Sequence, residues 1–324
     1  MRRRGFLSTA AGAATLASLP ALAQSPLRKV GFLHPGKVAA GDVRLASFAE
    51  GLRSKGFVEG RNVSVVARAA DFDPGRLAQF AGELVDSRVD LLFAVGSRAI
   101  QEARVRTSTL PIVALDLEAD PVASGFVASL ARPGGNLTGL FFDYAEFSGK
   151  WLELMGEIVP ELKHVAALWD PSTSAVQVDA AQAVAKSRGV ALEVIKVDSP
   201  SSIEPGFKTA AGMKVQAVLV LTSPLFGTLP RQVADAALRR RLPAITMFPE
   251  FAEVGGLIAY GTDQRDLYRQ SGEMVGKVLA GAKPADLPVE RPQRILLAVN
   301  MRTAATLGVT IPQVILLRAD QVIE

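Results

Sequence analysis

The stretch LLFAVGSRAIQEA, residues 91–103, is the key to the fold of this chain. Five apolar residues run directly into Gly96-Ser97, and a pattern typical of a helix follows at once. This predicts a buried strand, a very short turn and a helix whose first N–H groups have no partner within the helix. Such a helix end favours anions, and the Ser97 hydroxyl adds a donor. We therefore expect an anion subsite at Gly96-Ser97; the alternative is that Ser97 only caps its helix.

The same order of elements occurs twice along the chain, about 130 residues apart. Each half alternates apolar strands with helical patterns, and the third strand of each half is followed by a serine, Ser97 or Ser223. The expected strands span residues 29–33, 63–67, 90–95 and 111–114 in the first half, and 164–169, 192–197, 216–221 and 243–246 in the second. The first strands are followed by helices over roughly 43–55 and 174–187.

This alternation predicts an α/β fold with two doubly wound parallel-sheet (Rossmann-like) domains. Ligands of such sheets bind outside the carboxyl ends of the strands, so we expect a ligand cleft between the two domains. A helix over 266–279 is expected to return to the first domain, and a segment over 294–300 to cross back. The expected lobes are residues 24–140 plus about 262–287, and residues 141–261 plus about 288–324.

The N-terminus has the features of an export signal. Arg2-Arg3-Arg4 precedes a short apolar stretch, and Ala21-Leu22-Ala23 has the small-x-small form that a signal peptidase accepts. We expect residues 1–23 to be a signal peptide, either of the twin-arginine type or a plain secretory one. No cysteine follows the small-residue site, which excludes a lipoprotein signal.

Charge and composition exclude several classes of function. Removing residues 1–23 takes three arginines and no acid from 36 basic and 32 acidic side chains, so the net charge falls from +4 to +1. A nearly balanced chain does not indicate a nucleic-acid surface. With no cysteine and two histidines there are too few ligands for a His/Cys zinc site. Neither a Gly-x-Ser-x-Gly nor a Gly-x-Gly-x-x-Gly motif accompanies the strands, so we expect no cofactor and no enzyme. The sequence does not exclude a metal site made of oxygen ligands from the Asp residues.

Four segments carry a resemblance to a known family: VDLLFAVGS, LPIVALDLEADPVASGFVASLARPGGNLTGL, GGLIAYGTDQRDLYRQSGEMVGKVLAGAKPADLPVE and VNMRTAATLGVTIP. They resemble the ABC-transporter substrate-binding protein family, which has the type I periplasmic-binding-protein fold and includes members that bind tryptophan or other aromatic amino acids. The resemblance runs from about residue 27 to the C-terminus. It implies a periplasmic receptor that closes on a small-molecule ligand and delivers it to an ABC permease. We expect a monomer, because a cleft that must open and close tolerates few fixed partners. The alternative is a ligand-binding partner of a sensor or chemoreceptor.

The resemblance also points to site residues. The turn Gly96-Ser97-Arg98 resembles the place where relatives, which carry Gly-Thr-Pro-Ala, hold a ligand carboxylate. In the second lobe, relatives often carry acids where this chain has Ser223 and Phe248. Further candidates near strand ends or the first crossover are His34, Asp116, Glu118, Asp143, Tyr144, Asp170, Thr222 and Met247.

The lost acids favour a particular ligand chemistry. A desolvated ammonium group needs a counter-charge or several acceptors. We therefore expect a carboxylate ligand with an apolar or aromatic body and no ammonium group. Amino-acid binding, as in the relatives, is the alternative, because acids remain at other strand ends.

Overall fold

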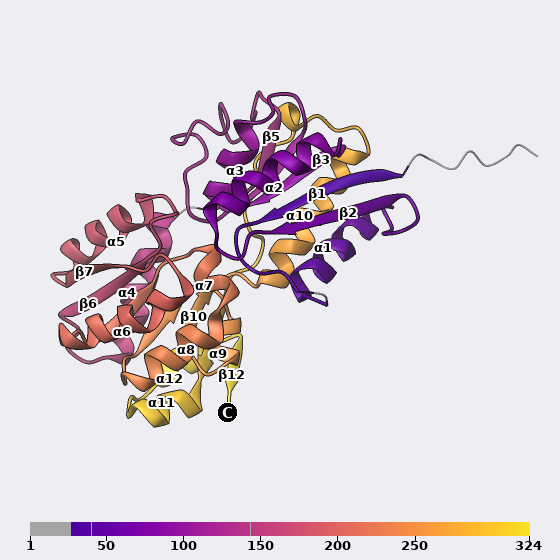
Figure 1. The fold of residues 1–324 in the computed structure, drawn as a ribbon. Coiled ribbons are helices and arrows are strands. Elements are labelled where there is room, and N and C mark those ends of the chain that lie inside the picture. Colours follow the sequence, from indigo (N-terminus) through magenta and orange to yellow (C-terminus); the bar gives the residue numbers. More distant parts are fainter. Residues whose placement is uncertain (1–26, 40, 143) are drawn as a thin grey trace, which may run out of the picture.

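The computed structural model describes residues 27–39, 41–142 and 144–324, with the side chains of residues 144–146 left out. The expected signal peptide and the candidate Asp143 lie outside the described residues. Within these ranges the chain forms two α/β lobes, joined where the chain passes between them (Figure 1). We call the lobe built on the first sheet the N-lobe and the lobe built on the second sheet the C-lobe.

The N-lobe is built on a five-stranded, wholly parallel sheet in the order β2-β1-β3-β4-β5. The strands are β1 (Arg28–His34), β2 (Val63–Ala69), β3 (Leu91–Val95), β4 (Ile112–Asp116) and β5 (Leu137–Phe141). Helices α1 (Val43–Ser54), α2 (Pro74–Asp86) and α3 (Ser97–Arg104) connect them. The strands β3, β4 and β5 are buried along their whole length, which explains why their sequences are continuously apolar rather than alternating.

The C-lobe repeats this arrangement and extends it. Its sheet has the order β12-β11-β10-β9-β8-β6-β7, so the run β7-β6-β8-β9-β10 matches the N-lobe order. The strands are β6 (His164–Trp169), β7 (Ala191–Lys196), β8 (Ala217–Val220), β9 (Ala244–Thr246), β10 (Ile258–Gly261), β11 (Leu296–Asn300) and β12 (Gln321–Ile323). The helices are α4 (Tyr144–Ile158), α5 (Val176–Ser187), α6 (Ile203–Gly212), α7 (Pro224–Thr228), α8 (Pro230–Arg239), α9 (Glu250–Glu253), α11 (Met301–Leu307) and α12 (Gln313–Arg318), with 3-10 turns at Pro200–Ser202 and Pro284–Asp286.

The expected pair of doubly wound domains is therefore confirmed, with one difference. Strand β11 pairs antiparallel with β10, so the second sheet is mixed rather than wholly parallel. The reason lies in the path of the chain. After β10 the chain leaves the carboxyl edge of the sheet for the N-lobe and re-enters from the same edge, which reverses its direction.

Helix α10 (Gln264–Leu279) follows a C-lobe strand but packs on the N-lobe, against α1 and strands β3, β4 and β5 (Figure 1). Two glycines permit this close packing. A Cβ on Gly51 of α1 would clash with the carbonyl oxygen of Arg269, and one on Gly272 of α10 would clash with that of Phe48. The contact fixes α10 to the N-lobe, so the segment before it, at Thr262-Asp263, forms one of the connections between lobes.

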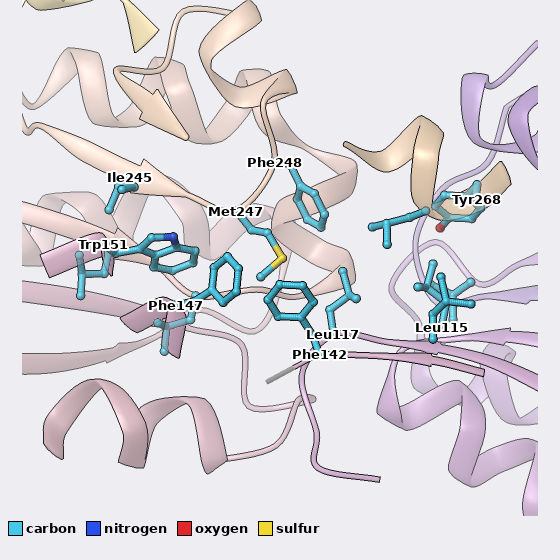
Figure 2. Packing of buried hydrophobic residues seen from close by; sticks show 14 of the residues in the cluster. Leu115, Leu117, Phe142, Phe147, Trp151, Ile245, Met247, Phe248 and Tyr268 are labelled. Carbon is cyan, nitrogen blue, oxygen red and sulfur yellow. The ribbon is translucent and has the colours of Figure 1, made fainter. Parts of the chain in front are cut away.

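A continuous apolar cluster passes from one lobe to the other. Figure 2 shows it running from Trp151 and Phe147 of α4 through Phe142, Met247 and Phe248 to Leu117, Leu115 and Tyr268. These side chains are buried, so the connections between the lobes are packed rather than solvated. Among the described residues, no helix is long and apolar enough to span a membrane.

Candidate functional site

The carboxyl ends of the strands in the two lobes face each other and enclose two small cavities. One cavity of about 30 Å³ is lined by residues of both lobes and of α10, among them His34, Arg44, Leu117, Glu118, Ser223, Phe248, Gln264 and Tyr268. A second cavity of about 80 Å³ is lined by Gly96, Ser97 and Arg98 of the N-lobe and by Asp170, Ser172, Thr173 and Pro224 of the C-lobe. The first of these volumes is enough for only one or two water-sized groups.

The N-terminus of α3 is already faced by side chains of the protein itself. Gly96 precedes the helix with a φ of 80°, and it makes no side-chain cap. The Ser97 hydroxyl donates to Oδ2 of Asp116 at 2.7 Å. The backbone N–H of Ser97 acts on Glu118, where it favours the charged carboxylate and so opposes the rise of its pKa. The N-terminus of α3, where we expected an anion, thus faces two carboxyl groups of the protein. They belong to Asp116 at the end of β4 and to Glu118 in the turn after it.

This geometry argues against the anion subsite expected at Ser97. A ligand carboxylate placed there would lie beside Asp116 and Glu118, and its Ser97 donor is already used. Arg98, the third residue of the expected subsite, is exposed and forms an ion pair with Glu102 at 3.2 Å. Ser97 and Arg98 therefore line the cleft, but their contacts do not favour the anion subsite expected there.

Asp116 and Glu118 form a buried carboxyl pair. Their side chains belong to residues that are 0% and 4% exposed. Burial raises the pKa of Asp116, against which the donors from Ser97 and from the Glu118 backbone act. The pKa of Glu118 is raised well above its ordinary value, first by burial, then by the charge of Asp116 and by a hydrogen bond in which the protonated Glu118 carboxyl donates to Asp116. Within the described part of the chain, Oε2 of Glu118 has no hydrogen-bond partner.

A third carboxyl group, that of Asp170, approaches from the C-lobe. Asp170 follows β6 and is buried, and its Oδ1 accepts from the backbone N–H of Ser172 at 2.9 Å. Burial raises its pKa, while Ser172 and the Ser223 side chain favour its charged form. Its charge contributes to the raised pKa of Glu118 on the other lobe. The charge of Asp170 therefore acts on Glu118 across the cleft, although the two residues line different cavities.

Sequence reasoning missed Arg44, which lines the same cavity as His34. Its guanidinium donates to both carboxylate oxygens of Asp42, to the carbonyl of Lys37 and, across the cleft, to Oγ1 of Thr228 at 3.1 Å. A signal was present, because Arg44 stands in the first turn of α1, where the helix dipole disfavours a cation. The ion pair with Asp42 compensates for that position.

His34 is held in its neutral form. Its Nδ1 accepts from the backbone N–H of Gly36 at 2.9 Å, and its Nε2 lies 3.2 Å from Nη1 of Arg44. Burial, followed by the charge of Arg44, lowers its pKa to about 3. A neutral imidazole offers no charge to a ligand anion.

The remaining candidates in the C-lobe differ in their exposure to the cleft. Phe248 lines the cavity opposite Leu117, and Ser223 caps α7 by accepting from the Phe226 N–H at 3.2 Å. Thr222 and Met247 line a separate small space behind the cleft, where their side chains contact each other at 3.7 Å. The side chain of Tyr144 is not described.

Helix α10 supplies residues that sequence reasoning did not propose. Tyr268 and Gln264 line the cavity, and Nε2 of Gln264 donates to the carbonyl of Gly227 at 2.9 Å. They were missed because α10 lies far along the chain from the strands it packs against. No group of three or more His, Cys, Asp or Glu residues able to hold a metal ion occurs among the described residues.

The lobes touch along α7. A Cβ on Gly96 would lie 2.8 Å from Cγ of Pro224, so the glycine allows the two lobes to approach this closely. The Arg44–Thr228 hydrogen bond lies in the same region. Two α/β lobes that close over a shared internal site are the architecture of a solute-binding protein.

Comparison with known proteins identifies the family. The model of the family described as ABC transporter substrate binding protein matches residues 34–323, and the chain belongs to that family. Its members are binding proteins, not enzymes. A tyrosine-binding protein of Clostridioides difficile (strain R20291) is 27% identical over 262 residues, which cover 80% of this chain and 75% of that protein.

Two solved structures show how the lobes are arranged. A domain from Streptococcus pneumonia in complex with L-Trp is 28% identical and superposes with a TM-score of 0.82, covering 92% of this chain and 100% of that one. A ligand-free, open substrate-binding protein with adhesive properties from Clostridium difficile is 26% identical, with a TM-score of 0.63 over 92% and 99% of the two chains. The chain therefore superposes more closely on the L-Trp complex than on the ligand-free, open protein.

Proposed function

We propose that this chain is the periplasmic solute receptor of an ABC importer. In this proposal the two lobes close on a small organic ligand with an apolar or aromatic body, and the closed receptor delivers it to a permease in the inner membrane. The observation that carries the proposal is the cleft between the lobes, which Leu117 of the N-lobe and Phe248 of the C-lobe line with apolar side chains; its volume of about 30 Å³ has to widen to admit such a ligand. A ligand that contacts both lobes stabilises the closed arrangement relative to the open one.

The relatives support an aromatic body. One is named as tyrosine-binding and another was solved with L-Trp, both of which carry an aromatic ring. The sequence-based preference for a carboxylate ligand without an ammonium group rested on the turn at Ser97 and on the acids absent at positions 223 and 248. The carboxylate part of this preference is weakened, because the turn faces the buried carboxyl groups of Asp116 and Glu118.

Export and organisation complete the proposal. Residues 1–23 act as the export signal, and the mature chain is a monomer. The lobes comprise residues 24–140 with about 262–287, and 141–261 with about 288–324. The packing of α10 against α1 and the pairing of β11 with β10 support this division.

A thermal-shift screen of the purified chain tests the proposal. The compounds are aromatic amino acids, aromatic acids, aromatic amines, small carboxylates and sugars. A compound that binds only the folded state raises the melting temperature. We expect hits among compounds with an aromatic or apolar body, and small-angle scattering should show a compact particle with the ligand bound. Hits confined to sugars would contradict the proposal.

A pair of variants locates the site. Phe248→Ala should weaken binding of a hit by about tenfold or more, because an apolar wall of the cavity is lost. Val314→Ala removes an apolar side chain that is 52% exposed in the C-lobe and does not line the cavities of the cleft, so it should leave affinity unchanged. Equal effects of the two substitutions would place the ligand elsewhere.

A further inference from the structure

Glu118 presents to the cleft a buried carboxyl oxygen, Oε2, that accepts no hydrogen bond from the described chain. Oε2 has no hydrogen-bond partner there, although Glu118 is only 4% exposed and lines the cavity between the lobes. An unpartnered buried carboxylate is costly, so such a group in a binding cleft indicates where a ligand donor is accepted.

The donors near this oxygen are already used. The Ser97 hydroxyl and the Glu118 backbone N–H both donate to Asp116. The Ser172 N–H donates to Asp170. None of the ion pairs among the described residues involves Asp116, Glu118 or Asp170. The three carboxyl groups therefore have more acceptor oxygens than nearby donors, and a bound cation would favour the charged form of Glu118 over the protonated form that burial favours.

The basic groups around the cleft are committed to other partners. The guanidinium of Arg44 is bound by Asp42, the Lys37 carbonyl and Thr228, and Arg98 is paired with Glu102. Lys37 forms an ion pair with Asp71 at 3.3 Å. A ligand carboxylate would therefore have to displace an existing ion pair, whereas a ligand cation would find three acids.

A primary ammonium group fits this arrangement. It carries three N–H donors, and the acids approach from two lobes and three points of the chain. Charge-assisted hydrogen bonds to buried carboxylates are strong. An ammonium group could bridge acids of both lobes only when the lobes are closed. The acids stand at positions 116, 118 and 170 rather than at positions 223 and 248, where this chain has Ser and Phe.

We propose that the ligand is an organic amine without a carboxylate, held by its ammonium group between Asp116 and Glu118 of the N-lobe and Asp170 of the C-lobe. This inference deepens the proposed receptor function and rests on it.

Three compounds that share one body test the inference by calorimetry on the full mature chain: phenethylamine, L-phenylalanine and hydrocinnamate. They carry an amine alone, an amine with a carboxylate, and a carboxylate alone. Phenethylamine should bind, L-phenylalanine about tenfold more weakly or worse, and hydrocinnamate not measurably. Tighter binding of L-phenylalanine or of hydrocinnamate than of phenethylamine would overturn the inference while leaving the receptor function intact.

Two substitutions test whether Glu118 and Asp170 hold the ammonium group of the ligand. Glu118→Gln and Asp170→Asn keep side-chain size and should each weaken amine binding by about tenfold or more. Glu50→Gln changes an exposed glutamate of α1 outside the cleft and is the matched control. Full amine affinity in a folded Glu118→Gln protein would overturn the proposal. If a variant fails to fold, the comparison of the three compounds on the wild-type protein still tests it.

Butylamine separates the inference from the proposed aromatic body. Binding of butylamine but of no aromatic compound, lost in Glu118→Gln, would support the ammonium site and contradict the aromatic body. A response to carboxylates alone would overturn the inference only. A chain that responds to no organic solute would overturn both.

Discussion

The Ser97 hydroxyl donates to Oδ2 of Asp116 at 2.7 Å, and both residues are buried at the cleft between the lobes. Strands β3 and β4 are neighbours in the sheet. Ser97 stands in the turn just after β3, and Asp116 is the last residue of β4. We expected the Ser97 turn to bind a ligand anion. Its hydroxyl instead donates to a buried acid of the protein itself. At this point the cleft is therefore bordered by carboxyl groups, those of Asp116 and of Glu118 beside it.

Replacing Ser97 tests that support. Ser97→Ala leaves Asp116 buried with one donor fewer and should lower the free energy of unfolding at neutral pH by about 1–3 kcal/mol. Ser97→Thr keeps the hydroxyl and should recover most of the loss. Urea denaturation of the two variants measures the difference, and equal stability of Ser97→Ala and the wild type would mean that the bond does not hold Asp116.

Glu118 should make the ligand-free protein less stable as the pH rises. Its pKa in the folded state is raised by burial, so the folded protein binds more protons than the unfolded chain above the ordinary value near 4.5. Stability is therefore lost as the pH rises through that window. Glu118→Gln should increase the free energy of unfolding at about pH 8 and make no difference at about pH 4.

Denaturation across this pH range in the absence of ligand measures the effect, with Glu50→Gln as control. A Glu118→Gln protein that keeps the wild-type pH slope would show that Glu118 titrates normally. The same substitution that stabilises the ligand-free protein should weaken ligand binding, a trade-off expected of a residue placed for function.

Glu250 should show the same sign of pH dependence at the base of α10. Burial, aided by the charges of Asp263 and Glu253, raises its pKa to about 7. Its Oε1 accepts from the N–H of Gln264 at 3.0 Å, and its Oε2 has no partner among the described residues.

Glu250→Gln keeps an acceptor for Gln264 and removes the charge. It should stabilise the protein by up to roughly 3 kcal/mol above about pH 7 and have no effect below about pH 4.5, since the folded form then holds the proton. The free energy of unfolding at the two ends of this range is the measurement. A gain that is the same at both ends would have to come from packing instead.

Gly96 should control how closely the lobes approach. A Cβ there would lie 2.8 Å from Cγ of Pro224, so Gly96→Ala should hold the lobes apart, increase the radius of gyration with ligand present and weaken ligand binding.

The matched control is Gly125→Ala. Gly125 also has a positive φ, 66°, but a Cβ there would meet no atom within 4 Å. Both variants should lose about 1 kcal/mol of stability through backbone strain, and only Gly96→Ala should change the scattering profile. Identical profiles and affinities for the two variants would mean that the Gly96–Pro224 contact does not limit closure.

Much of the architecture could be predicted because it depends on local patterns. The apolar runs that become β3 and β8 are continuous over the lengths at which they are buried on both faces. The repeat then fixes the order β2-β1-β3-β4-β5 and its counterpart through right-handed crossovers. The antiparallel β11 was not predicted, because its direction depends on the route of the chain through the other lobe.

The structure places several candidates from the sequence at one cleft, whereas the chemistry proposed for them from the structure differs from that expected of the turn at Ser97. Asp116, Glu118 and Asp170 were identified because polar residues at the ends of apolar strands stand out. Arg44 was not, because its role depends on Thr228, a residue 184 positions away in the other lobe.

The sequence by itself determined that this chain forms two parallel-sheet domains and that polar residues gather at the carboxyl edges of their strands. Only the tertiary structure decided that Ser97 donates to Asp116 and that the charge of Asp170 acts on Glu118 across the cleft. The physical reason is range. Strand and helix patterns are set by neighbours along the chain, whereas the charge of a cleft depends on which side chains sheet register and lobe closure bring within hydrogen-bond distance.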